Sequence, residues 1–256
     1  MGRLLWQMVA HDLRARYAGS LLGLFWNVIH PLIMVGIYTL VFSRVIGARL
    51  ETGNHDIYAF SIYLCAALLP WNGFSEVVKR STSVFLDNAN LVKKVAFPRF
   101  FLHLHLLLGA AINAGIVTII FLGFLLLAGR SPSPGALLVW LVFMLLELLL
   151  GAGIGLFAST LNVFFRDVDQ IVTIVLQIWF WLTPIVYVAA VLPEPARRLM
   201  RFNPLYHLAR IQQQLLLAGT FPEAGRTALL FLLPLVLIPA GLGFYRLLRF
   251  RIPDEL

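Results

Sequence analysis

The sequence predicts an all-α, polytopic membrane protein with six transmembrane helices. Hydrophobic residues make up 60% of the chain and charged residues only 12%, and the mean hydropathy is +0.87. The charges gather in short segments that separate apolar runs long enough to cross a bilayer. A soluble domain of 256 residues could not bury this much apolar surface. We therefore expect a single transmembrane domain over residues 1–256.

Residues 3–17 carry too many charges to cross a membrane, but they are amphipathic at helical spacing. A helical wheel separates an apolar side from a polar side: Leu5, Trp6, Val9, Leu13 and Tyr17 against Arg3, Gln7, His11 and Arg14. The pattern predicts an N-terminal interfacial helix within residues 1–17, which is either a lipid anchor or a docking element for a partner. The six spans then lie within residues 18–256.

The first half of the chain predicts three spans. Residues 17–43 carry no charge and contain the first, with a kink expected near Pro31. The second covers residues 57–75 and the third residues 100–129.

The strongly basic connection of residues 76–99 separates the second span from the third. Asn88 or Asn90 caps a short helix over residues 91–97, which Pro98 ends. This helix is expected to lie across the membrane surface.

The second half predicts three further spans, at residues 136–161, 171–190 and 227–245. Between the first two of these, the charges of residues 161–171 must leave the hydrocarbon, because a charge at the bilayer centre costs roughly 2.5–3.5 kcal/mol on insertion scales. Prolines divide residues 192–226 into pieces too short to cross, so two short re-entrant or interfacial helices are expected there.

Basic residues predict the orientation. With six spans, twelve Lys and Arg residues lie on the side of the termini and eight on the other, which favours cytoplasmic termini. The net charge of +8 would suggest nucleic acid for a soluble protein. In a membrane chain it indicates anionic lipid, and no nucleic-acid partner is expected.

Few motifs suggest chemistry. No phosphate-binding G-x-x-x-x-G-K-[ST] loop occurs, so the chain is not expected to bind ATP by that route. Asp167 and Asp169 could hold Mg²⁺ in a membrane glycosyltransferase, or they could cap a helix and pair with Arg166. Glu147, an acidic residue within a span, could serve an ion-coupled carrier or bond to a neighbouring helix.

Six segments resemble a known family. They are RARYAGSLLGLFWNVIHPLIMVGIYTLVF from residue 14, LLPWNGF from 68, NLVKKVAFPR from 90, LNVFFRDV from 161, WLTPIVY from 181 and FNPLY from 202. Together they resemble the transmembrane subunits of type-2 ABC exporters, specifically the O-antigen polysaccharide permeases called Wzm. The capsule and teichoic-acid permeases are close to this family and remain alternatives.

The resemblance implies a non-enzymatic ABC-2 transmembrane domain in the bacterial inner membrane. It implies a homodimer docked on a separate Wzt-like ATPase, which binds ATP and Mg²⁺, so no cofactor is expected in this chain. The expected ATPase-coupling residues are Arg14, Lys93, Lys94, Phe165, Arg166 and Asp167. The expected periplasmic gate residues are Arg198, Arg201, Asn203 and Pro204.

The implied substrate is a glycan linked to a polyprenyl diphosphate. Sugars pack their apolar faces on aromatic rings, so aromatic residues beside polar or proline positions are candidates for the path. These are Tyr38, Trp71, Phe74, Trp179, Trp181 and Tyr187. The alternative for each is an interfacial aromatic belt that contacts membrane lipids.

Overall fold

The computed structural model describes residues 2–15, 58–94 and 99–256, together with five single positions between residues 26 and 37. Within these residues the regular elements are helical: α1 (Gly2–Ala15), α3 (Ala59–Asp87), α4 (Ala89–Lys94), α5 (Phe100–Leu127), α6 (Pro134–Phe164), α7 (Val168–Trp181), η3 (Ala189–Val191), α8 (Glu194–Met200), α9 (Pro204–Ala218), α10 (Ala224–Leu248) and α11 (Ile252–Glu255). The predicted first span falls almost wholly outside the described residues, and so does Tyr38.

Three of these helices are long and apolar enough to cross a membrane: α5, α6 and residues Thr227–Leu248 of α10. They coincide with the predicted third, fourth and sixth spans. The proline-rich segment between α5 and α6 ends in a capped helix start, because the Ala136 amide donates to the Ser133 hydroxyl at 3.2 Å. Pro134 follows at the first helical position, where its missing amide costs nothing.

Helix α3 extends further than predicted. The expected second span ended at residue 75, but the helix continues to Asp87. Its added turns are amphipathic: Val77, Val78, Ser81 and Thr82 are buried, whereas Lys79 is exposed. Charged residues therefore continue the helix along one face, and do not begin a loop.

Helix α7 is shorter than predicted. The expected fifth span reached residue 190, but the helix ends at Trp181 after 14 residues. Pro184 discourages helical backbone in the residue before it. The Pro184 carbonyl instead accepts hydrogen bonds from the Tyr63 hydroxyl at 3.3 Å and from Gln213 Nε2 at 3.0 Å. Side chains of α3 and α9 thus hold this segment in an irregular conformation.

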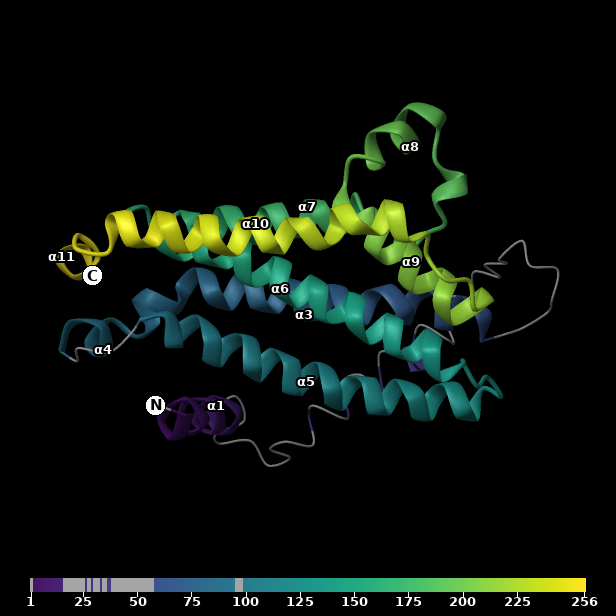
Figure 1. The fold of residues 1–256 in the computed structure, drawn as a ribbon, viewed down its shortest axis with the longest axis horizontal. Coiled ribbons are helices and arrows are strands. Elements are labelled where there is room, and N and C mark those ends of the chain that lie inside the picture. The colour runs from purple at the N-terminus through teal and green to yellow at the C-terminus, as the bar shows by residue number, and fades with distance from the viewer. Residues whose placement is uncertain are drawn as a thin grey trace.

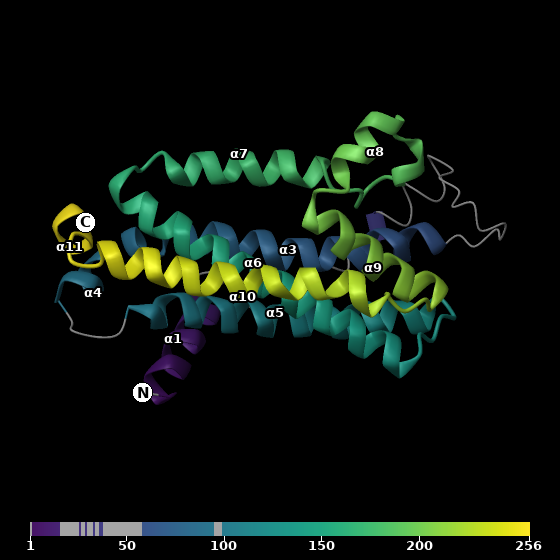
Figure 2. The same cartoon turned by 45° about the horizontal axis from the view of Figure 1, so that its top comes forward.

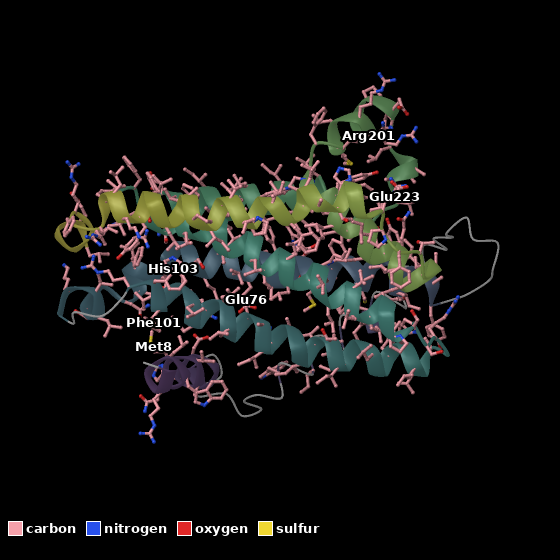
Figure 3. The ribbon with its side chains drawn as sticks, viewed as in Figure 1. Met8, Glu76, Phe101, His103, Arg201 and Glu223 are labelled. Atoms are coloured by element: carbon pink, nitrogen blue, oxygen red, sulfur yellow. The ribbon has the colours of Figure 1, made fainter. Side chains whose placement is uncertain are left out.

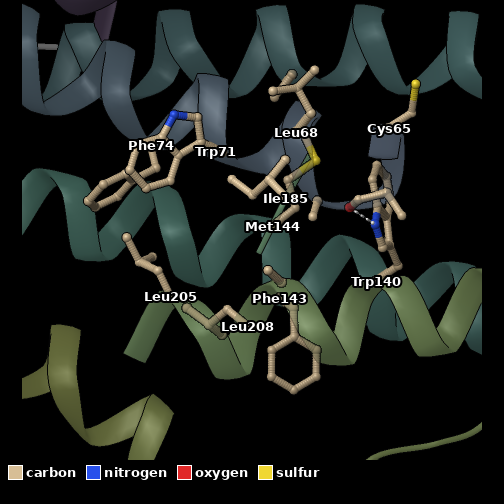
Figure 4. Packing of buried hydrophobic residues seen from close by; sticks show 14 of the residues in the cluster. Cys65, Leu68, Trp71, Phe74, Trp140, Phe143, Met144, Ile185, Leu205 and Leu208 are labelled. Atoms are coloured by element: carbon tan, nitrogen blue, oxygen red, sulfur yellow. Dashed lines mark hydrogen bonds between the residues drawn. The ribbon is translucent and has the colours of Figure 1, made fainter. Parts of the chain in front are cut away.

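The core lies where α6 packs between α3 and α10. Glycines of α6 allow this close approach: a Cβ at Gly151 would lie 2.9 Å from the Phe74 carbonyl oxygen, and one at Gly153 would lie 2.8 Å from Leu237 Cβ. Figure 4 shows the buried side chains around Trp140, whose indole nitrogen donates to the Ala66 carbonyl at 2.9 Å.

The helices run lengthwise and create two distinct ends (Figures 1 and 2). Helices α4 and α11 lie at one end with the turn from α6 to α7 and both chain termini, and we call this the α4–α11 end. Helices α8 and α9 lie toward the other, which we call the α8–α9 end. Figure 3 shows Arg201 and Glu223 toward the α8–α9 end, and Met8, Phe101 and His103 toward the opposite one.

Candidate functional site

The turn between α6 and α7 presents three consecutive exposed side chains, Phe165, Arg166 and Asp167. Phe165 is 66% exposed although it is a large apolar residue. The turn is short, because the Phe165 amide still bonds to the Leu161 carbonyl and the Val168 amide bonds to the Phe165 carbonyl. An exposed aromatic ring beside two opposite charges is suited to contact a protein.

A buried asparagine fixes this turn to the bundle. Asn162, only 1% exposed, donates from Nδ2 to the Thr82 carbonyl of α3 at 3.1 Å. Its Oδ1 accepts from the Asp169 amide in the first turn of α7 at 3.2 Å. The one side chain therefore joins α3, α6 and α7, a role that the sequence analysis missed. The sequence shows only a polar residue near the end of an apolar run, which does not identify its partners.

The expected cap and ion pair are not formed. Asp167 occupies the position before α7, but its side chain makes no capping hydrogen bond. Asn162 supplies the acceptor instead, from the preceding helix. In the part of the chain that the structure describes, no carboxylate lies within 4.0 Å of the Arg166 guanidinium. Arg166 and Asp167 thus both project outward.

A small hydrophobic cluster supports the same end. Phe85 of α3, Leu102 of α5, Val163 of α6 and Ile252 of α11 are buried together. His103 Nε2 lies 2.9 Å from the buried Ser159 hydroxyl and connects α5 to α6. The helix ends beside the exposed turn are therefore packed together, so the turn is held in place.

Helix α1 is attached to α3 by an ion pair. Arg80 donates through both terminal nitrogens to the Asp12 carboxylate, and its Nη1 contact is 3.0 Å. Arg80 also lies 3.5 Å from Glu76. On the predicted apolar side Val9 is fully buried, but Trp6 is 64% exposed and does not join the same contact surface. The side chain of Arg14 is not among those described.

Helix α4 begins two residues before the predicted short helix, and residues 95–98 lie outside the described residues. Asn88 precedes it, but the capping contact differs from the expected one. Its backbone carbonyl accepts from the Leu91 and Val92 amides at 3.0 Å, while its side chain donates back to the Val84 carbonyl of α3. Lys93 is exposed; the Lys94 side chain is not described.

Four of the predicted path residues form a continuous aromatic cluster through Phe180, which the sequence analysis did not single out. Ring centroids lie 5.5 Å apart for Trp71 and Phe74, and 5.6 Å apart for Trp71–Phe180, Phe74–Trp179 and Phe180–Trp181. Trp71 and Phe74 are buried between α3 and α7, whereas Trp181 is 59% exposed. Tyr187 is partly buried, and its hydroxyl donates to the Trp181 carbonyl at 2.6 Å.

The predicted pieces between α7 and α10 fold as two short helices, α8 and α9, which Asn203 connects to α7. Its Oδ1 accepts from Trp179 Nε1 at 2.9 Å and from the Leu205 amide at 3.0 Å, so it caps α9. Its Nδ2 donates to the Leu182 carbonyl and the Thr183 hydroxyl at 3.2 and 3.1 Å. Pro204 begins α9, and Arg198 and Arg201 are exposed near the end of α8.

The two acidic sites considered for other functions, Glu147 and the pair Asp167 and Asp169, have few polar or acidic side chains around them. Glu147 is 3% exposed and lies against the side chain of Gln212 in α9. This contact with a neighbouring helix is looser than an ordinary hydrogen bond, since neither polar atom of the Gln212 amide has a partner of hydrogen-bond geometry among the described residues. Asp167 and Asp169 meet no third metal-ligand side chain there: groups of three or more His, Cys, Asp or Glu residues do not occur in the described ranges.

Comparison with known proteins covers nearly the whole chain. Residues 3–217 match the family described as ABC-2 type transporter. The chain is 28% identical over 247 residues to the O-antigen export system permease protein RfbA of Klebsiella pneumoniae, covering 96% of this chain and 92% of that protein. The protein of the same name from Myxococcus xanthus is 29% identical over 244 residues, with 94% and 91% covered. The polysialic acid transport protein KpsM of Escherichia coli is 23% identical over 236 residues, with 92% and 89% covered.

Proposed function

The chain belongs to the ABC-2 type transporter family, and from this premise we propose that it is the transmembrane permease subunit of an ATP-driven exporter of lipid-linked polysaccharide. The observation that carries the proposal is the near full-length similarity to permeases named for O-antigen export. The subunit is a multi-pass protein of the bacterial inner membrane and supplies no catalytic residue. ATP and Mg²⁺ bind a separate Wzt-like ATPase. The similarity to KpsM supports a capsule glycan as the second candidate cargo, with teichoic acid the further alternative.

The α4–α11 end is the proposed ATPase-docking face. Three features support it: the exposed turn of Phe165, Arg166 and Asp167, the nearby exposed Lys93, and α1, which Arg80 ties to α3. Arg14 and Lys94 are included by their place in α1 and α4. ATP-driven movement of the partner would displace this turn. Asn162 would pass the displacement to α3 and α7, because it is hydrogen-bonded to both.

The topology proposed for this role has six spans and cytoplasmic termini. Both termini lie at one end of the bundle, which supports their placement on one side of the membrane (Figure 1). Helix α7 supports the proposed homodimer, because its residues Ile171, Ile174 and Ile178 are about half-exposed and only Leu176 of this helix is buried. A second subunit would cover part of this apolar face.

Purification tests the proposal directly. Mild-detergent extraction from native membranes, followed by mass spectrometry, is expected to recover an ATPase subunit at equal stoichiometry together with a glycosylated polyprenyl lipid. Recovery of the chain alone, even after gentle cross-linking, would contradict the exporter function.

Removing the exposed charges of the turn is expected to uncouple the exporter. Arg166→Ala with Asp167→Ala should lower export and substrate-stimulated ATP hydrolysis in the assembled complex by roughly tenfold, because one or two charge-assisted contacts to the partner are lost. Arg130→Ala is the matched control, because Arg130 is exposed in the connection from α5 to α6, toward the opposite end of the bundle (Figure 1). Unchanged export and ATP hydrolysis in the double variant would show that the turn does not couple ATP hydrolysis to export.

The proposed glycan path uses the aromatic residues that cluster along α3 and α7. Trp181 is the accessible member, whereas a glycan could reach Trp71 and Phe74 only if α7 moved away from α3. Trp179, Tyr187 and Tyr38 complete the proposed set, and Asn203, Pro204, Arg198 and Arg201 belong to the proposed periplasmic gate.

Trp181→Ala is expected to reduce export by roughly two- to tenfold, since ring packing contributes about 0.5–1.5 kcal/mol. Its thermal unfolding midpoint should stay close to that of the wild type, because the ring is 59% exposed. Trp181→Phe should restore much of the export. Leu126→Ala serves as the control, because Leu126 is 69% exposed on α5, outside the proposed path and the proposed dimer face. Export of Trp181→Ala equal to that of Leu126→Ala would remove Trp181 from the path.

A further inference from the structure

A large cavity opens at the α8–α9 end. It has a volume of about 780 Å³. Tyr63 from the first turns of α3, the segment from Pro184 to Ala190, α8 and α9 together line it. Neither α8, with 7 residues, nor α9, with 15, is long enough to cross a bilayer, so most of the lining comes from elements that do not span.

The lining of the cavity is strongly cationic. Arg197, Arg201 and Arg210 contribute to it with His207, whereas no Asp or Glu does among the described residues. In that same part of the chain, Arg201 and Arg210 have no carboxylate within 4.0 Å. Arg197 pairs with Glu194 at 2.9 Å through Nη2, yet its Nε is buried without a hydrogen-bond partner. The cavity therefore offers guanidinium donors that the protein does not itself satisfy.

Part of the remaining wall is apolar, and hydrogen bonds hold this wall in place. Val188, Ala189 and Leu217 supply apolar surface beside the arginines. The Tyr63 hydroxyl donates to the Pro184 and Tyr187 carbonyls, at 3.3 and 3.0 Å, and Gln213 donates to the Pro184 carbonyl. These bonds tie α3 and α9 to the irregular segment, so the cavity does not depend on loose loops.

An anion with several oxygens and an attached apolar group fits this lining. Guanidinium groups donate in a planar fork that matches phosphate oxygens. The apolar wall would receive the first part of a hydrocarbon chain, whose burial is favourable. We infer that the cavity binds the phosphate or diphosphate group of a lipid, with Arg201 and Arg210 as the main donors. Two sources share this chemistry: a phospholipid headgroup and, resting on the proposed function, the diphosphate carrier of the exported glycan.

Binding to the purified full-length chain tests the site without ATP or export. The chain is placed in phosphatidylcholine nanodiscs, and radiolabelled polyprenyl diphosphate is titrated in. The wild type should bind saturably, and Arg201→Gln with Arg210→Gln should weaken binding by roughly tenfold or more. Arg198→Gln is the matched control, because Arg198 lies on the same helix, is 72% exposed and does not line the cavity. Thermal unfolding checks that the double variant is folded, and Arg201→Lys with Arg210→Lys should retain part of the affinity.

Competition separates the two sources. Displacement of the label by phosphatidylglycerol in the nanodisc would support a general lipid-phosphate site, whereas binding that phosphatidylglycerol leaves unchanged would support a carrier site. Absence of saturable binding to the wild type, or equal affinity in the double variant and Arg198→Gln, would overturn the inference. Failure of the exporter function would appear separately, as a missing ATPase partner with this binding intact.

Discussion

Asn203→Ala is expected to reduce export more than tenfold and to destabilise the purified protein by roughly 2–4 kcal/mol. Asn203 makes four hydrogen bonds that hold the end of α7 against the start of α9. Alanine would remove the cap of α9 and leave Trp179 Nε1 and the buried Thr183 hydroxyl with fewer partners. Thermal unfolding in detergent and export in reconstituted vesicles are the two measurements.

Asn203→Asp separates the two halves of this role. A carboxylate can still accept from Trp179 Nε1 and the Leu205 amide, but it cannot donate to the Leu182 carbonyl or the Thr183 hydroxyl. We expect an intermediate loss of stability. If Asn203→Ala unfolded at the wild-type temperature and exported normally, the connection between α7 and α9 would have no mechanical importance.

Asn162→Ala is expected to have a comparable effect from the opposite end of α7. The side chain is almost fully buried, and its loss would remove the bond to the Thr82 carbonyl and leave the Asp169 amide, in the first turn of α7, without a partner. A lost hydrogen bond costs about 0.5–1.5 kcal/mol and an unsatisfied buried group about 1–3 kcal/mol, so the variant should lose roughly 2–4 kcal/mol of stability. We also expect substrate-stimulated ATP hydrolysis in the assembled complex to fall, because the turn is no longer fixed to α3.

A second variant distinguishes coupling from general instability. Asn162→Asp keeps the acceptor for the Asp169 amide but points a carboxylate oxygen at the Thr82 carbonyl, which it cannot bond when ionised. This should disturb the link to α3 more than the link to α7. Normal coupling in Asn162→Asp, measured at a temperature where the protein remains folded, would limit the role of Asn162 to stability.

The sequence predicts those parts of the fold that hydropathy alone determines. Apolar length identifies α5, α6 and the membrane part of α10, and amphipathicity identifies α1. The predicted end of α3 was wrong because a charged residue such as Arg80 is typical of a loop. Only the structure shows that Asp12 lies beside Arg80 and pairs with it. The end of α7 was wrong because Pro184 is held by Tyr63 and Gln213, which are distant in sequence.

In the candidate site, too, local sequence patterns predict some features, whereas others depend on residues that are distant in the chain. The exposed turn of Phe165, Arg166 and Asp167 could be read from charge placed between apolar runs, and the structure places all three on the surface. Asn162 could not be assigned a role, because its value depends on Thr82, 80 residues away in the chain. Phe180 likewise gains its meaning from Trp71, a neighbour only in three dimensions. The roles of the coupling, path and gate residues stay predictions.

Asn162 and Asn203 attach the two ends of α7 to the neighbouring helices. Its first turn is bound through Asn162, and its last turn is bound through Asn203 by way of Trp179. Between them only Leu176 is fully buried, while Val172 and Phe180 pack partly buried against the core, so hydrogen bonds hold α7 at its two ends and a narrow apolar face holds it along its length. A straight helix of 14 residues is about 21 Å long and stiff along its axis. A displacement at one end of α7 would therefore move the other end as well, because the helix does not unfold locally. The two ends of the subunit would then change state in one cooperative step.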